Sequence, residues 1–331
     1  MRAAADVRAA AGLAIGRAIG LAIGLAIGLA LIALALPACG DAAPRLAGDR
    51  GAQAPAGPRV VRRVEPADLI PADLDLVVRV DVARMRAGLG QAAADALARR
   101  ALDEAPDALL ESALPRADVV WLGLRLADLE EGDRVVVLEG RMAGLSPDPD
   151  RWEAAPSSQG GVSVFDRRGS VDARADAARV VALGDRAVAL VSAVEVSSVA
   201  RVLRDGPDAR RGDPAAEGLV SLDLRARRLP PRLERRFPSI GALVAGVERV
   251  RAVASLHDDG VRVDAEIVGI DAAGAGRARR FLEVLRDNVG ETRHAELVEA
   301  LSIEQVERAV RLRWLLPAPV VLALLSGRSP G

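Results

Sequence analysis

Leu76-Val77-Val78-Arg79-Val80-Asp81-Val82 is the stretch that decides the fold. Its even-numbered positions are apolar, and Arg79 and Asp81 alternate with them. This period of two is typical of a strand with one buried face and one solvated face. The pattern returns at Leu219-Val220-Ser221-Leu222-Asp223-Leu224-Arg225, where Asp223 again lies between two aliphatic residues. We therefore expect a chain of two halves, each of which opens on such a strand.

The first half continues with further apolar patterns. Strands are expected at 118–126, 134–142, 162–165, 179–183 and 187–191. Helices are expected within 84–112, which is rich in Ala and Leu, and at 147–154. Ser192 and Glu195 have the spacing of a capping box, so we expect them to begin a helix that Gly206 ends.

The second half has a similar order of patterns. Strands are expected at 250–257, 261–270, 302–307 and 309–316, and helices at 233–245, after Asp271 and at 319–325. Asp258-Asp259-Gly260 is a strong hairpin signal between the first two strands. On the strand 250–257 and just before it, Arg249, Arg251, Ser255 and His257 alternate with apolar residues and should lie on the outer face.

These patterns predict an α+β fold with a largely antiparallel sheet and helices on one face. We interpret the common order of strand, helix, strand, hairpin, strand and helix as an internal duplication. The first repeat is expected at 69–206, with an insertion, and the second at 218–327. The segment 207–217, rich in Gly, Pro and charge, is expected to be a linker.

The N-terminal segment predicts where the protein resides. Ala18–Leu36 is uncharged and follows Arg2, Arg8 and Arg17, which is the order of a secretory signal. It ends at Leu36-Pro37-Ala38-Cys39-Gly40, and Cys39 is the only cysteine of the chain.

This ending resembles the lipobox of bacterial lipoproteins, and the resemblance covers residues 1–41 alone. It implies that residues 1–38 are a signal peptide, that Cys39 is acylated with palmitate-type chains, and that the protein is anchored in the cell envelope on the periplasmic side. Gly40 stands where some bacteria use Asp for inner-membrane retention, which favours the outer membrane. Residues 39–68, without periodicity, are then the lipidated cysteine and a flexible tether.

Two other interpretations of this segment stay open. Gly16, Gly20, Gly24 and Gly28 have the small-xxx-small spacing of packed membrane helices, so the segment could remain as an uncleaved membrane helix. It could also be a plain cleaved signal that leaves a free protein. Because arginines stay on the cytoplasmic side, residues 41–331 are expected outside the cytoplasm in every case.

Composition excludes several classes of function. The net charge is −1, which argues against nucleic acid as a partner. The chain has no lysine, so Schiff-base catalysis and a P-loop are excluded. With one cysteine and only two histidines, His257 and His294, we expect no metal site and no cofactor. Gly88 and Gly90 imitate a dinucleotide fingerprint but lie too far after the strand that ends at Val82.

Two groups of residues remain as candidates for chemistry. The first is a basic cluster that could bind an anion, because guanidinium groups bind carboxylates and phosphates through paired hydrogen bonds. It consists of Arg225, Arg227, Arg228, Arg232, Arg235 and Arg236. The second is the pair of acidic turns, Glu130/Glu131 and Asp258/Asp259, where carboxylates are common in any protein.

The leading hypothesis is a non-catalytic, lipid-anchored envelope protein that serves as a structural or protein-binding module. Its partners would be the membrane, through the lipid on Cys39, and an envelope protein. The alternatives are a module that binds an anionic envelope polymer through the basic cluster, and a hydrolase that works through the carboxylate pairs.

Overall fold

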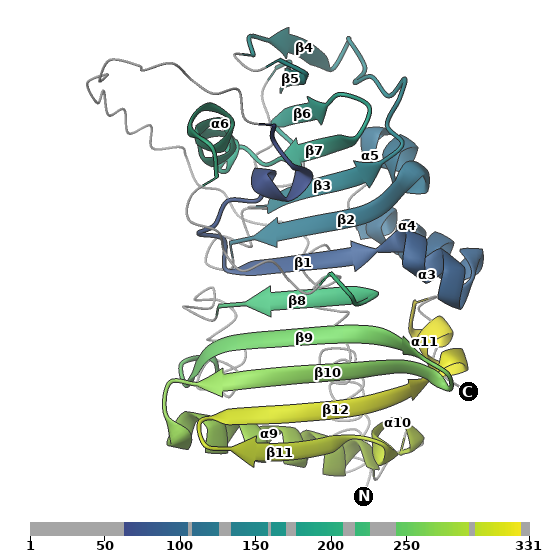
Figure 1. The fold of residues 1–331 in the computed structure, drawn as a ribbon, viewed down its shortest axis with the longest axis vertical. Helices are drawn as coiled ribbons and strands as arrows, with labels where there is room; N and C mark the ends of the chain where they lie inside the picture. Colours follow the sequence, from purple (N-terminus) through teal and green to yellow (C-terminus); the bar gives the residue numbers. More distant parts are fainter. Residues whose placement is uncertain are drawn as a thin grey trace, which may run out of the picture.

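The backbone forms one large antiparallel sheet flanked by helices (Figure 1). A computed structural model describes residues 63–104, 108–125, 134–157, 160–169, 177–207, 216–225, 243–290 and 295–325. Within these ranges twelve strands follow the order β11-β12-β10-β9-β8-β1-β2-β3-β7-β6-β5-β4. Every neighbouring pair is antiparallel. The predicted α+β class and antiparallel sheet are confirmed.

The bounds of the elements agree with most of the sequence patterns. The strands are β1 Leu76–Asp81, β2 Ala117–Leu124, β3 Arg134–Gly140, β4 Trp152–Ala155, β5 Val162–Arg167, β6 Arg179–Leu183, β7 Ala187–Val191, β8 Val220–Leu224, β9 Val247–His257, β10 Gly260–Gly269, β11 Ser302–Val306 and β12 Ala309–Pro317. The helices are η2 Pro66–Leu69, α3 Val82–Leu89, α4 Gln91–Glu104, α5 Ala108–Ala113, η3 Leu114–Arg116, α6 Val196–Asp205, α9 Ala272–Gly290, α10 Glu296–Glu299 and α11 Ala318–Leu325.

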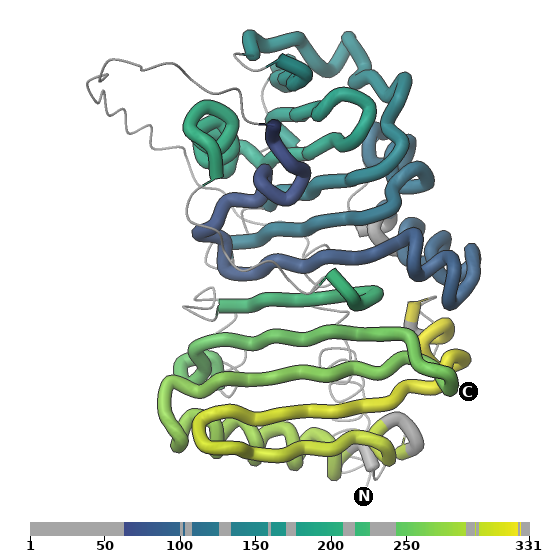
Figure 2. Tube along the Cα trace, in the orientation of Figure 1, coloured from purple at the N-terminus to yellow at the C-terminus, as the bar shows by residue number. Residues whose placement is uncertain are grey.

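The two strands that open the halves pair with each other at the centre of the sheet. Val78 of β1 lies opposite Leu222 of β8, and the ladder runs from Leu76/Leu224 to Val80/Val220. The first half, coloured from purple to teal, and the second, from green to yellow, extend from this seam in opposite directions (Figure 2). The order β1-β2-β3-β7-β6 in the first half matches β8-β9-β10-β12-β11 in the second. The internal duplication itself stays a prediction.

The opening strand is buried on both faces, which corrects the expectation of one solvated face. Leu76 and Val78 belong to the core on one side of the sheet, whereas Val77 belongs to a separate core on the other side. Arg79 and Asp81 lie beside Val77 and are also buried. The Arg79 Nη2 atom donates a hydrogen bond of 3.1 Å to Asp81 Oδ2. This ion pair offsets part of the free-energy cost of burying the two charged side chains.

The helices cover the sheet unevenly. On one face, α4, α9 and α11 contribute to the largest core, which includes Ala278 of α9 and Val321 of α11. The other face of the first half carries η2 and α6 (Figure 1). Their Leu69 and Val199 belong to a separate core together with Val137 of β3. The prediction that all helices lie on one face is therefore wrong in the first half. The same face of the second half is lined by exposed charged residues.

Three local predictions are corrected. Residues 152–155 form β4, although a helix was expected at 147–154. Pro66 is buried within η2 together with Leu69, so packed residues start before the predicted boundary at residue 69. The α6 helix starts at Val196 without the expected capping box. The predicted linker at 207–217 and the predicted helix at 233–245 fall mostly outside the described residues.

Among the helices that the structure describes, none is long and apolar enough to cross a membrane.

Candidate functional site

Most of the residues singled out from the sequence lie outside the described ranges. These are Cys39, Glu130, Glu131, His294, Arg227, Arg228, Arg232, Arg235 and Arg236. Arg225 is described at the end of β8, where its backbone N–H donates a hydrogen bond of 2.8 Å to the carbonyl of Asp75. The lipid anchor, the basic cluster and the first carboxylate pair therefore stay predictions.

The second carboxylate pair and His257, which the structure describes, lie at an exposed turn. Asp258 and Asp259 form the turn between β9 and β10, and His257 is exposed at the end of β9, as expected for a solvated side chain. Gly88 lies inside α3, and Gly90 lies between α3 and α4 with a φ of 88°. Neither glycine is in a strand-to-helix turn, so the resemblance to a dinucleotide fingerprint is accidental. Among the described residues no group of three or more His, Cys, Asp and Glu side chains could hold a metal ion.

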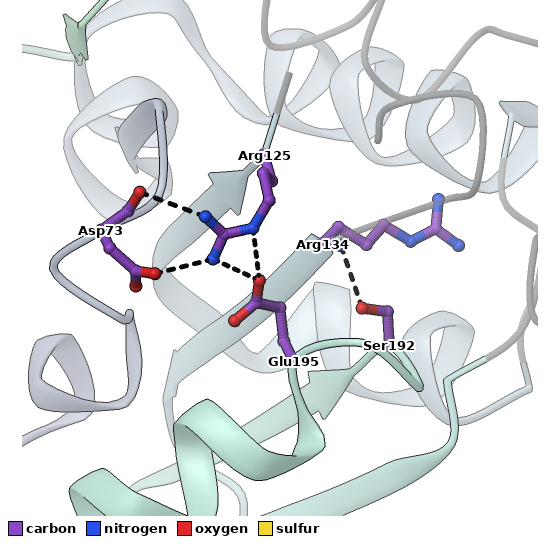
Figure 3. Close-up of polar contacts among 5 residues, drawn as sticks. All are labelled: Asp73, Arg125, Arg134, Ser192 and Glu195. Carbon is purple, nitrogen blue, oxygen red and sulfur yellow. Dashed lines mark hydrogen bonds and ion pairs between the residues drawn. The ribbon is translucent and has the colours of Figure 1, made fainter. Parts of the chain in front are cut away.

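A partly buried ion-pair network joins three segments of the first half (Figure 3). Arg125 follows β2, and its Nε and Nη2 atoms both donate to Glu195 Oε1, at 3.1 and 2.8 Å. Its Nη2 atom also donates to Asp73 Oδ2 at 3.0 Å. Burial by itself would lower the pKa of Arg125, but hydrogen bonds and charges from Glu195 and Asp73 outweigh burial and raise this pKa. The guanidinium group therefore stays charged and holds the buried carboxylate of Glu195.

The network explains why the expected capping box is absent. The Ser192 hydroxyl accepts a hydrogen bond of 3.1 Å from the backbone N–H of Arg134, so it connects the helix start to β3 (Figure 3). Glu195 turns toward Arg125, and α6 begins after it without a side-chain cap. We assign this network to positioning α6 on the sheet, since Arg125, at the end of β2, holds Glu195 at the start of that helix.

The candidate functional site lies on the second half, on the exposed face of β9, β10, β12 and β11. Two rows of side chains cross this face, and each row follows the register of the strands. The first row consists of Arg251, Glu266, Arg311 and Glu304. The second consists of Val253, Asp264, Arg313 and Ser302. We refer to these eight residues as the charged face.

Charges alternate in sign along the first row. Glu266 and Arg311 form an ion pair of 3.6 Å in the middle, and Asp264 and Arg313 form one of 3.4 Å in the second row. Arg313 is 77% exposed, so these pairs are hydrated and contribute little to stability. Between the strands the surface sinks into a shallow depression of about 320 Å³.

The two ends of the first row differ from its middle. Within the part of the chain that the structure describes, neither Arg251 nor Glu304 has a hydrogen-bond or ion-pair partner. Both side chains are exposed. Antiparallel sheets commonly keep one solvated polar face, but this face offers two charges of opposite sign at fixed positions that no described residue pairs with.

Comparisons with known proteins assign neither a family nor a role to this chain. No family model matches the chain, and no curated protein matches it. Among solved structures, crystal form I of TP0453 matches with a TM-score of 0.49 and 11% identity, over 82% of this chain and all of that one. Crystal form III of TP0453 matches with a TM-score of 0.47 and 10% identity, over 80% of this chain and 98% of that one. The identity is too low to transfer any residue role.

Sequence patterns alone identified only part of the charged face. The alternation around Arg251 predicted correctly that it points away from the core. The neighbours of Arg251 could not be predicted, because Glu266 and Arg311 come beside it only through the strand order β9-β10-β12. The signal that could identify the outward-facing residues is the alternation of charged and apolar residues, which recurs in each of these strands.

Proposed function

We propose that this protein is a non-catalytic, lipid-anchored protein of the cell envelope, which binds another protein through the charged face. The N-terminal segment supports the anchor, because an uncharged stretch ends on the sole cysteine, Cys39. Two or more acyl chains would hold the body at a membrane surface, since each buried methylene contributes about 0.8 kcal/mol.

The observation that carries the binding role is the pattern of charges on an exposed sheet face. Arg251 and Glu304 lie at opposite ends of a registered row, without partners among the described residues. Fixed charges of alternating sign select a partner with the opposite pattern and set its register. The depression beside them gives room for side chains of that partner.

The anchor and the binding face can be tested in one strain. Mass spectrometry of the mature N-terminus should find an acylated Cys39, and Cys39→Ser should release the protein from the membrane fraction. A photo-crosslinking residue in place of Arg313, on the charged face, should capture a protein in intact envelopes. The same residue in place of Arg280, exposed on α9, is the matched control and should capture much less. A bare Cys39 would refute the anchor, and equal capture at the two positions would refute the binding face.

A further inference from the structure

We propose that the partner of the charged face is a second copy of this chain. The inference rests on the proposed function, because it names the protein that the charged face binds. The two rows of the charged face are symmetric about the line between β10 and β12. Each residue on the β10 side of that line has its counterpart at the same distance on the β12 side.

The charges are opposite in sign across this line. In the first row Glu266 is matched by Arg311, and further out Arg251 is matched by Glu304. In the second row Asp264 is matched by Arg313. Strands lie about 4.8 Å apart, so the two outer charges of the first row are separated by roughly 14 Å.

A two-fold axis that lies in the sheet surface, along this line, would place a second copy face to face with the first. The rotation exchanges the two sides of the line, so Arg251 of one copy meets Glu304 of the other, and this contact occurs twice. Glu266 likewise meets Arg311, and Asp264 meets Arg313. Each of these contacts joins opposite charges, which is the self-complementarity that a symmetric dimer requires.

The twist of the sheet is compatible with this two-fold rotation. Strands in sheets twist with a fixed hand, and a uniformly twisted surface maps onto itself when it is rotated by half a turn about an axis along its strands. Two such faces therefore nest, as the sheets of a sandwich do when their strands are nearly aligned. The depression on each copy leaves space for hydrated guanidinium groups, and wet interfaces of this kind are common.

The contact should be weak in solution and effective on a membrane. The face is four strands wide, at about 4.8 Å per strand, and five residues long, at about 3.4 Å per residue. Its area is therefore roughly 320 Å². Two copies would bury roughly 650 Å², below the 1,200 Å² or more of a stable specific interface. Anchoring both copies to one surface raises their effective concentration and compensates for the small area.

The test uses the full-length chain in phosphatidylcholine vesicles. Donor and acceptor dyes are attached through Asp287→Cys, which is exposed on α9 and away from the charged face, and energy transfer reports association. Arg251→Glu and Glu304→Arg should each weaken association roughly 100-fold, because each places like charges together at two symmetric contacts. Both residues are exposed and lack partners among the described residues, so both variants should fold. Arg280→Glu is the matched control and should associate like the wild type.

The decisive measurement mixes the two variants. A donor-labelled Arg251→Glu chain and an acceptor-labelled Glu304→Arg chain should associate as strongly as the wild type, because every contact between them is again opposite in sign. The double variant should also associate with itself. Unchanged association of the single variants, or no recovery in the mixture, overturns the proposal. If the wild type does not self-associate while the probe at Arg313 still captures a different protein, the second copy is wrong and the proposed function stands.

Discussion

Removal of the Arg125 side chain should be the most damaging single change in the polar network of the first half. We consider Arg125→Met, which keeps an unbranched side chain and deletes the charge. The variant leaves Glu195, whose side chain is 1% exposed, without either of its hydrogen bonds from the guanidinium group. The Glu195 Oε2 atom has no partner among the described residues, so the whole carboxylate would be buried and unpaired.

The size of the loss in folding free energy follows from the burial of the Glu195 carboxylate. Breaking a buried ion pair by removing one partner costs about 3–5 kcal/mol. For a body of this size, 1 kcal/mol shifts the melting temperature by about 2–4 °C, so the variant should melt roughly 6–20 °C below the wild type. Asp73→Ala should cost less than about 1 kcal/mol, because the Asp73 side chain is 52% exposed.

The assay is urea denaturation followed by circular dichroism, with the slope of the transition checked for each variant. Arg280→Met makes the same substitution at an exposed position and should change the free energy of unfolding by less than about 0.5 kcal/mol. Arg125→Met with Glu195→Leu removes both charges and should recover most of the loss, to within about 2 kcal/mol of the wild type. A loss in Arg125→Met no greater than that in Arg280→Met would refute the reasoning.

Three further predictions concern helix ends and close contacts, each measured as a change in the free energy of unfolding. Gly274→Ala should cost about 1–3 kcal/mol, because a methyl group there would collide with the carbonyl oxygen of Gly246. Gly276→Ala on the same helix would meet no atom of the described residues closer than 3.6 Å and should stabilise by up to about 1 kcal/mol. Equal effects of the two substitutions would contradict the contact. Asp271→Ala should cost about 1 kcal/mol, because the Asp271 Oδ1 atom accepts a hydrogen bond of 2.6 Å from the N–H of Gly274 at the start of α9. Asp271→Asn keeps an acceptor oxygen and should retain most of this stabilisation. Ser192→Ala should cost about 1–3 kcal/mol by leaving a backbone N–H of β3 without its acceptor, and a neutral effect would show that water replaces the hydroxyl.

Sequence patterns predicted the elements well where one face of a strand or helix packs on a core. The strands that became β10 and β12 have such patterns, and so does α6, whose Val199 and Leu203 are buried together. Local signals failed where tertiary partners decided the outcome. Ser192 and Glu195 have the spacing of a capping box, but the distant Arg125 and Arg134 bind them.

The central strand shows a second reason for failure. Alternation in β1 predicted a solvated face, yet Arg79 is buried beside Trp121, with its guanidinium carbon 5.7 Å from the ring centre. Both faces of β1 are buried because a separate core forms on each: Leu76 and Val78 belong to one, and Val77 belongs to the other together with Leu69. Which core covers a strand depends on the strand order, and that order is set by the whole chain. The rows of the charged face depend on the same order, so each strand predicts its outward residues but not their neighbours.

The seam between β1 and β8 has a consequence for how the molecule could be divided. The five registered pairs of this seam hold the two half-sheets side by side, and the covalent connection between the halves runs through the predicted linker at 207–217. A polypeptide cut in that connection would still carry a complete strand edge on each fragment, with matching apolar side chains. Two separately expressed fragments should therefore recognise each other and reassemble, which would make this protein a natural scaffold for a split reporter of proximity.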